Sequence, residues 1–337
     1  MIKVGVIGLG MMGNTHLDVY AQRDDVEIVA VADIDPKRLA GKEKAGGNIK
    51  GQAQGGFDLS KVARYDEGKK LIADKNVDLV DVCLPTPLHL EFGKAVLAAG
   101  KHLLTEKPLA RTAAQAKELA AAAARASTLA MPAMCMRFWP AWVWLKEAVA
   151  DGRYGPVHAA TFRRVAQHPG GPFYEDGDAC GGALLDLHIH DTDFIQFCFG
   201  KPKAVTSVGY SSITNQIDHV LTHYAYDDIP LVAAEGGWAM AKGFGFQMQY
   251  CVNFANATAT FDIGRGPAPI VQEPGKEAQT VPVSPAMGYT HEIDYFVRCI
   301  AQGHKPTTVT MSDGAQAVRI IEAEAQSIRE GRSVAIV

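Results

Sequence analysis

The sequence predicts an α/β protein with two domains. A doubly wound parallel sheet is expected over residues 1–130, and an α+β domain with an open, mostly antiparallel or mixed sheet over residues 131–337. Three observations predict this: a glycine-rich turn between two apolar strands, an alternation of strands and helices up to about residue 130, and longer strand-like stretches after it.

The glycine-rich turn, GLGMMG at residues 8–13, directly follows a short apolar strand at residues 3–7. A helix-like stretch comes next, and a second apolar strand at residues 28–32 ends at Asp33. This is a Rossmann βαβ unit with the dinucleotide fingerprint in its first turn. Its glycines allow a tight turn and close approach of a pyrophosphate, and the helix N-terminus offers free N–H groups to the phosphates.

The acid at the end of the second strand predicts which dinucleotide binds. Asp33 is placed to accept hydrogen bonds from the adenosine ribose hydroxyls, and its charge would repel a 2′-phosphate. The sequence therefore predicts NAD as the cofactor. Lys37 and Arg38 follow closely in the sequence and leave NADP as the alternative, because either could reach a 2′-phosphate.

Composition narrows the class of protein. The chain has 337 residues, of which 47% are hydrophobic. Its net charge of −4 gives no electrostatic reason to expect binding to nucleic acid or anionic membranes. Its six cysteines lack metal-ligand spacing and fit reduced thiols. The first strand begins at residue 2, and no apolar run is long enough to span a membrane. We therefore expect a cytoplasmic protein.

Three irregular segments fall at the ends of predicted parallel strands: residues 8–13, 85–87 and 106–108. A helix predicted at residues 89–99 ends at Gly100, as a C-terminal cap should. Ligands of doubly wound sheets bind beyond the carboxyl ends of the strands. The predicted cofactor-binding residues are Gly8, Gly10, Met11, Met12, Gly13, Asp33, Leu84, Pro85, Thr86, His89, Glu106 and Lys107.

Two other stretches of the first domain carry less information. Residues 112–126 predict a helix of strong helix formers. The glycine-rich residues 46–56 predict a mobile surface loop.

The second domain reads mainly as strands with few helices between them. Helices are expected at residues 289–301 and 312–330, the second capped by Ser312 with Asp313 in its first turn. A sheet face without covering helices predicts a homodimer or homotetramer. The strands are expected at residues 157–164, 204–210, 221–226, 231–240, 246–254 and 257–263.

A second cluster of chemically active residues lies at residues 181–193. If the chain is helical from Leu184, Asp186 and His190 are four residues apart and share a face. A histidine held by a carboxylate suits proton transfer from an alcohol as hydride leaves its carbon. Lys107 precedes a proline, which favours extended backbone, and its ammonium group could stabilise the developing alkoxide.

Other interpretations of these residues are open. A lysine before proline is often a solvated surface residue, and an Asp/His pair at helical spacing is often a surface or capping pair. His188 and His190 also raise the possibility of a metal site. Residues two apart point to nearly opposite sides of a helix, however, and there is no further ligand cluster, so no metal is predicted.

Together these motifs resemble the Gfo/Idh/MocA oxidoreductases, which include glucose–fructose oxidoreductase and inositol 2-dehydrogenase. The similarity rests on the fingerprint with Asp33, on LPTPLH at residues 84–89, on Glu106-Lys107-Pro108 and on residues 181–193. Further similarity covers essentially the whole chain. The resemblance implies a Rossmann domain, an open-faced sheet, dimers or tetramers, and NAD(P)-dependent oxidation of sugars or polyols by a Lys/Asp/His set that matches Lys107, Asp186 and His190.

The resemblance also implies which residues contact the substrate. His188 departs from the family, where glycine is common, so its imidazole either contacts substrate or packs locally. His291 also stands where relatives often place a substrate contact. The predicted substrate-binding residues are Lys107, Arg137, Arg164, His168, Asp186, His190 and Tyr289.

The sequence thus predicts an NAD-dependent oxidoreductase of a sugar, cyclic polyol or sugar derivative, with Lys107, Asp186 and His190 as catalytic residues. Three alternatives share the fold: an NAD-dependent, redox-assisted glycoside hydrolase, a reductase of a non-sugar carbonyl, and a non-catalytic regulator that responds to NAD. The intact Lys/Asp/His set argues against the regulator.

Overall fold

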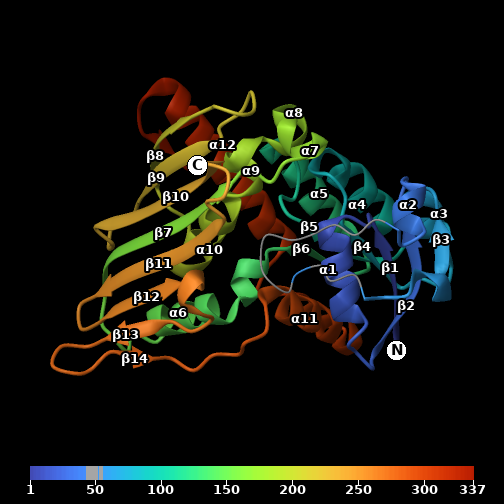
Figure 1. Cartoon of the computed structure of the whole chain (residues 1–337), viewed down its shortest axis with the longest axis horizontal. Helices are drawn as coiled ribbons and strands as arrows, with labels where there is room; N and C mark the ends of the chain where they lie inside the picture. Colours follow the sequence, from blue (N-terminus) through green and yellow to red (C-terminus); the bar gives the residue numbers. More distant parts are fainter. Residues whose placement is uncertain (43–51, 53–55) are drawn as a thin grey trace. The chain divides into compact units, whose positions relative to one another are not determined.

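The computed structural model describes residues 1–42, 52 and 56–337, so most of the predicted loop at residues 46–56 lies outside the described residues. The chain divides into two compact units. Unit 1 comprises Met1–Met134 and Tyr289–Ala315, and unit 2 comprises Cys135–Gly288 and Gln316–Val337. Each unit is built on one sheet (Figure 1).

The sheet of unit 1 has six strands in the order β3-β2-β1-β4-β5-β6, and every pairing is parallel. This confirms the predicted doubly wound sheet. Its central strands are buried on both faces, as parallel sheets require. The strands are β1 (Ile2–Ile7), β2 (Val26–Ala32), β3 (Ala63–Tyr65), β4 (Leu79–Val82), β5 (His102–Glu106) and β6 (Ala130–Ala133).

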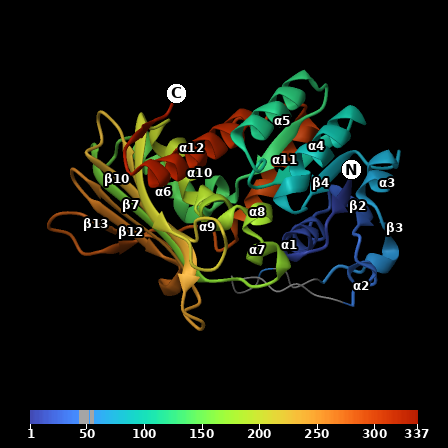
Figure 2. The same cartoon turned by 90° about the horizontal axis from the view of Figure 1, so that it is seen from above.

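Helices cover both faces of this sheet. Figure 2 shows α4 and α5 on the side of the sheet opposite to α1. Helix α11 packs near α1 through an ion pair between Arg23 and Asp294. The helices of unit 1 are α1 (Met11–Tyr20), α2 (Pro36–Leu39), α3 (Gly68–Ala73), α4 (His89–Ala98), α5 (Ala113–Arg125) and α11 (Gly288–Gln302, in unit 1 from Tyr289), with short 3-10 turns at Leu59–Lys61 and Thr86–Leu88.

The sheet of unit 2 has nine strands in the order β14-β13-β12-β11-β7-β10-β9-β8-β15. Only the pairing of β7 with β10 is parallel, which confirms the predicted mixed sheet. The strands are β7 (Val157–Gln167), β8 (Ala204–Tyr210), β9 (His219–Ala225), β10 (Leu231–Met240), β11 (Phe246–Phe254), β12 (Thr258–Asp262), β13 (Ile270–Gln272), β14 (Gln279–Thr280) and β15 (Val334–Ala335).

Unit 2 contains more helix than the sequence predicted. The additional helices lie within residues 140–199, before and after β7. Trp142 of α6 is fully buried and meets Tyr250 and Phe261 of the sheet edge-on, at ring distances of 5.1 and 4.7 Å. Figure 2 shows the helices of this unit on one face of its sheet. They are α6 (Pro140–Ala150), α7 (Pro172–Glu175), α8 (Gly177–Cys180), α9 (Gly182–Asp186), α10 (Ile189–Phe199) and α12 (Met311–Glu330, in unit 2 from Gln316), with 3-10 turns at Cys135–Phe138 and Ile263–Arg265.

The start of α12 differs from the prediction, which made Ser312 its cap. The helix begins at Met311, and its cap is Thr310, two residues before the predicted cap. The Asp313 amide donates to the Thr310 hydroxyl at 3.1 Å, and the Thr310 amide donates to the Asp313 carboxylate at 2.8 Å. This reciprocal capping box satisfies two otherwise unpaired N–H groups.

Candidate functional site

The glycine turn joins β1 to α1 and is shaped by two close backbone approaches. Gly8 has a φ of +93°, and a Cβ there would lie 2.3 Å from the carbonyl oxygen of Cys83. A Cβ on Gly13 would lie 1.8 Å from the carbonyl oxygen of Gly8. At Gly10, in contrast, nothing lies within 4 Å of an added Cβ. The packing of the protein accounts for Gly8 and Gly13, whereas Gly10 faces open space.

Helix α1 begins beside this open space. Its N-terminal cap is Gly10, which has no side chain to bond the first amides, and its first turn contains no acid. The first N–H groups and the positive end of the helix dipole are therefore available to an anion. Met11 and Met12 occupy the first two helical positions, so their amides belong to this set. These residues fit the pyrophosphate of a dinucleotide.

Asp33 follows β2 and is 7% exposed. One carboxylate oxygen accepts the Leu9 amide at 2.7 Å, and the other accepts the Asp35 amide at 2.8 Å. Each oxygen has a second lone pair that can accept a ribose hydroxyl. The Arg38 guanidinium lies 3.8 Å away. The carboxylate thus stands beside the fingerprint turn, as a ribose-binding acid should.

The other two cofactor segments follow neighbouring strands of the same sheet. Leu84, Pro85 and Thr86 come after β4, and Lys107 comes directly after β5, which ends at Glu106. Because β1, β4 and β5 are adjacent and parallel, all three segments lie at one edge of the sheet. Pro85 is exposed, Leu84 and Lys107 are half-buried, and Thr86 is buried.

His89 and Glu106 are held more tightly than the sequence suggested. His89 is 0% exposed, and both of its ring nitrogens lie 2.7 Å from backbone carbonyl oxygens, those of Leu84 and Pro108. Both ring nitrogens therefore contact the loops that surround the ring, and the predicted contact of His89 with the cofactor stays a prediction. The Glu106 carboxylate accepts the Lys107 amide at 3.0 Å.

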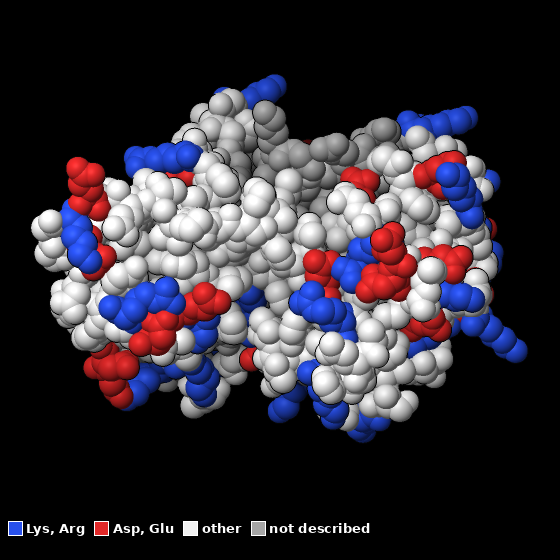
Figure 3. Space-filling view, turned by 90° about the horizontal axis from the view of Figure 1, so that it is seen from below, with Lys and Arg blue, Asp and Glu red and all other residues white. Residues whose placement is uncertain are grey.

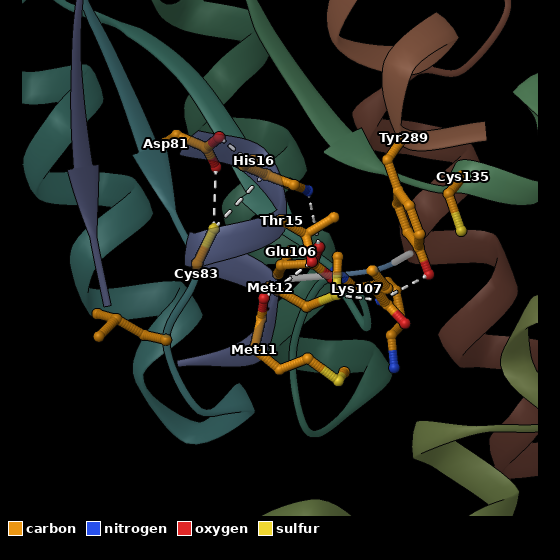
Figure 4. A network of polar contacts seen from close by, with 12 residues as sticks. Met11, Met12, Thr15, His16, Asp81, Cys83, Glu106, Lys107, Cys135 and Tyr289 are labelled. Atoms are coloured by element: carbon orange, nitrogen blue, oxygen red, sulfur yellow. Dashed lines mark hydrogen bonds and ion pairs between the residues drawn. The ribbon is translucent and has the colours of Figure 1, made fainter. Parts of the chain in front are cut away.

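A buried polar network beneath the turn was not predicted (Figure 4). The His16 Nδ1 lies 2.8 Å from the Asp81 carboxylate, which also accepts the Tyr20 hydroxyl at 3.0 Å and the Cys83 thiol at 3.4 Å. The other His16 nitrogen lies 3.4 Å from Glu106. Asp81, a charge inside an otherwise apolar strand, was the signal in the sequence that such a network exists.

Charge within this network shifts its titrating groups. Burial by itself lowers the pKa of His16, but the charge and hydrogen bond of Asp81, and then the charge of Glu106, raise it above its ordinary value. Burial raises the pKa of Glu106, and burial together with Asp81 raises the pKa of the Cys83 thiol well above its usual range.

Among the described residues, His16, Asp81 and Cys83 place three possible ligand atoms within 4.8 Å of one another. They are hydrogen-bonded to each other, and the thiol is held protonated. Both features favour a hydrogen-bonded network over a metal centre.

The second cluster lies in unit 2. The continuous helix from Leu184, on which the shared face of Asp186 and His190 was conditional, is interrupted. Helix α9 ends at Asp186, and α10 begins at Ile189. The His190 amide donates to the carbonyl of Leu187, not to that of Asp186. Asp186 and His190 are both half-buried, and the Cys135 thiol lies 4.0 Å from His190 Nδ1. Lys107 belongs to unit 1, so the convergence of the three residues stays a prediction.

Two of the predicted substrate-binding arginines form buried bidentate ion pairs with α10. Arg137 bonds Asp193 at 2.8 and 2.7 Å, and Arg164 bonds Asp191 at 2.8 and 3.1 Å. None of the four side chains is more than 3% exposed. These ion pairs give both guanidinium groups a structural role. The predicted contacts of the two arginines with substrate stay predictions.

The structure distinguishes between the two interpretations of His188. Its ring is 0% exposed, 3.1 Å from the Glu324 carboxylate and 3.2 Å from the Tyr224 hydroxyl. Thr192 and Thr222 donate to the same carboxylate. His188 therefore packs locally in a buried polar network between α10, α12 and the sheet.

The remaining predicted substrate-binding residues, His168 and Tyr289, each contact other side chains or the backbone of their own unit. His168 Nε2 donates to the carbonyl of Tyr174 at 3.2 Å, and its ring meets Trp238 edge-on. Tyr289 belongs to unit 1, where its hydroxyl accepts the Gln52 amide at 3.2 Å and its ring lies 6.5 Å from that of His16. Their contacts with substrate also stay predictions.

The sequence matches two family profiles in order along the chain. Residues 2–134 match the oxidoreductase family with an NAD-binding Rossmann fold, and residues 142–260 match the GFO/IDH/MocA C-terminal domain.

Among similar proteins, myo-inositol 2-dehydrogenase of Thermotoga maritima is 32% identical over 59% of this chain and 55% of its own length. Inositol 2-dehydrogenase of Rhizobium meliloti is 24% identical over 99% of both chains. The chain thus spans little more than half of the first relative and nearly all of the second.

Solved structures share the fold over the whole chain. A levoglucosan dehydrogenase in complex with NADH and levoglucosan superimposes with a TM-score of 0.86 at 21% identity, covering 99% of both chains. The predicted fold and resemblance are confirmed, and so is the predicted cofactor class. Because both domain profiles match, this chain belongs to the Gfo/Idh/MocA oxidoreductase family, and its first domain is an NAD-binding Rossmann domain.

Proposed function

We propose that this protein is an NAD-dependent dehydrogenase of a sugar, cyclic polyol or sugar derivative. The observation that carries the proposal is one edge of the unit 1 sheet, where the N-terminus of α1, the Asp33 carboxylate and Lys107 follow β1, β2 and β5 of the same parallel sheet. The relatives named above, two inositol dehydrogenases and a levoglucosan dehydrogenase, support the substrate class.

In the proposed reaction, bound NAD supplies the hydride acceptor. Lys107 donates a hydrogen bond to the reacting hydroxyl oxygen and stabilises negative charge on it. His190 takes the hydroxyl proton as the C–H bond breaks and the carbonyl forms. Asp186 orients the imidazole and stabilises its charged form. In the reverse direction His190 returns the proton.

A screen of sugars and polyols with NAD tests the proposal, with absorbance of NADH as the signal. Turnover with at least one substrate is expected. Cleavage of a glycoside without net NADH would favour the redox-assisted hydrolase. Tight NAD binding without turnover of any alcohol or carbonyl would favour the regulator.

Cofactor preference is expected to follow Asp33. NAD(H) should bind more tightly than NADP(H), and Asp33→Ala should reduce that ratio by about tenfold, the loss of roughly one charge-assisted hydrogen bond. Isothermal titration calorimetry measures both affinities. Asp58→Ala is the matched control, because Asp58 is in the same unit and caps the 3-10 turn at Leu59–Lys61. Equal or tighter binding of NADP(H) to the unmodified protein would contradict the prediction.

We further propose that unit 2 binds the substrate and joins copies of the chain. Its outer sheet face carries large exposed apolar side chains at Val208, Tyr210, Leu221 and Leu231. Val208 pairs directly with Leu221, so their side chains share a face, and the alternate residues Val205, Val220 and Val232 are buried under the helices. Large exposed apolar side chains that share one sheet face are typical of an interface.

A homodimer or homotetramer at micromolar concentration is therefore expected. Leu221→Glu should lower the mass measured by light scattering, because a charge would be buried at the interface. Ile34→Glu changes an equally apolar exposed residue of unit 1 and should leave the mass unchanged. A monomeric mass for the unmodified protein throughout that range would count against the assembly.

The proposed setting is the cytoplasm, without nucleic-acid or membrane partners. All six cysteines belong to the described residues, and none of them is joined in a disulfide there. Basic and acidic side chains are interspersed on the face drawn in Figure 3. Within the described residues, every helix is too short or too polar to cross a membrane.

A further inference from the structure

His89 lies between two backbone carbonyl groups and contacts both. It is the first residue of α4 and is fully buried. Its Nδ1 lies 2.7 Å from the carbonyl oxygen of Pro108, and its Nε2 lies 2.7 Å from that of Leu84. A carbonyl oxygen only accepts hydrogen bonds, whereas a neutral imidazole has a single N–H. Both contacts are hydrogen bonds only when each ring nitrogen carries a proton.

A doubly protonated His89 is unfavourable at this position for two reasons. The first turn of a helix is unfavourable for a cation, because the N-terminus carries the positive end of the dipole. Burial adds a desolvation cost. The two short hydrogen bonds to carbonyl oxygens contribute to offsetting both costs, since hydrogen bonds from a charged donor are the strong ones.

The two carbonyls belong to different loops at the cofactor edge of the sheet. Leu84 follows β4, and Pro108 lies two residues beyond the end of β5. Lys107 lies between Glu106 and Pro108, and its own amide donates to the Glu106 carboxylate at 3.0 Å. The backbone around Lys107 is thus fastened on one side by Glu106 and on the other, through Pro108, by His89.

We propose that His89 is a positioning residue: a doubly protonated imidazole that ties the Leu84 loop to the Lys107-Pro108 turn. It thereby holds the lysine in register with the loop that faces the cofactor. The proposal rests on the proposed function, because it assumes that Lys107 acts on the reacting oxygen. A displacement of about 1 Å at such a group costs on the order of 100-fold in rate.

The bridge itself is tested without any turnover. In protein labelled with ¹⁵N-histidine at neutral pH, both ring nitrogens of His89 should carry a proton, and the signals are assigned by through-bond correlation to the His89 backbone. A spectrum in which only one ring nitrogen is protonated would overturn the bridge. This measurement uses the unmodified protein, so it does not depend on the folding of a variant.

The positioning role is tested by His89→Gln beside the matched control His102→Gln. His102 is also in unit 1, but its Nδ1 accepts the Leu129 amide at the start of β5, the end away from Lys107. His89→Gln should lower kcat by about 10- to 100-fold, with NADH binding followed by fluorescence changing much less. His102→Gln should leave kcat near that of the unmodified protein.

The outcomes separate the two proposals. Equal kcat values for the two variants would overturn the positioning role, and so would a His89→Gln variant that loses NADH binding and kcat in proportion. If the unmodified protein turns over no substrate, the proposed function is wrong and the positioning role falls with it. The NMR experiment still decides whether the bridge exists.

Discussion

Replacement of Lys107 or His190 by alanine is expected to lower the rate of hydride transfer by about 10²- to 10⁴-fold, the usual cost of losing a general acid or base. NAD affinity should change far less, because neither change removes the glycine turn or Asp33. Single-turnover measurement of NADH formation gives the rate, and calorimetry gives the affinity. Lys117→Ala and His304→Ala, which alter exposed residues, should retain full activity.

Combined variants show whether the residues act as one unit. The Lys107/His190 double variant should be little worse than the poorer single variant, because residues of one catalytic unit are strongly non-additive. Asp186→Asn should keep the shape and weaken the orientation of the imidazole. The oxidation rate should rise as an imidazole loses its proton, and this limb should vanish in His190→Ala. Near-normal turnover of that variant would mean that another group is the base.

Asp191→Ala is expected to lower the free energy of unfolding of unit 2 by about 3–5 kcal/mol, because it leaves the Arg164 guanidinium buried and unpaired. All four tryptophans lie in unit 2, so urea denaturation followed by tryptophan fluorescence measures that unit. Asp227→Ala breaks an exposed ion pair with Lys203 and should cause little measurable change.

A double variant distinguishes loss of the pair from loss of packing. Arg164→Met with Asp191→Leu replaces both charges by apolar groups and should recover most of the lost stability. If Asp191→Ala is as stable as the unmodified protein, the ion pair does not support α10 in the way the structure implies.

Local pattern in the sequence predicted most of unit 1. The glycine turn, the apolar strands and the Gly100 helix end are encoded within a few residues, so they can be recognised without knowledge of the rest of the fold. The strands of unit 2 were predicted for the same reason, since alternation and turn residues mark them. Helix α6 was missed because its tryptophan-rich face resembles the apolar strands beside it.

The sequence alone could not predict which distant residues pair in the folded protein. Arg164 and Asp191 are 27 residues apart, and His16 and Asp81 are 65 apart, so only the folded chain shows that each buried charge has a partner. From the sequence, an arginine near a predicted site therefore shows only its possible contact with substrate, and its support of a helix stays hidden. The same limit hid the contacts of His89, whose partners are backbone carbonyls that every residue possesses.

Unit 1 consists of two parts of the sequence that are synthesised at different times. Unit 1 needs residues 289–315, which bring Tyr289 to His16 and Asp294 to Arg23. A ribosome delivers these residues only after it has made nearly all of the nine-stranded sheet. The dinucleotide domain, although first in the sequence, therefore completes its structure late in synthesis. Its first 134 residues lack their contacts with residues 289–315 while unit 2 is being synthesised.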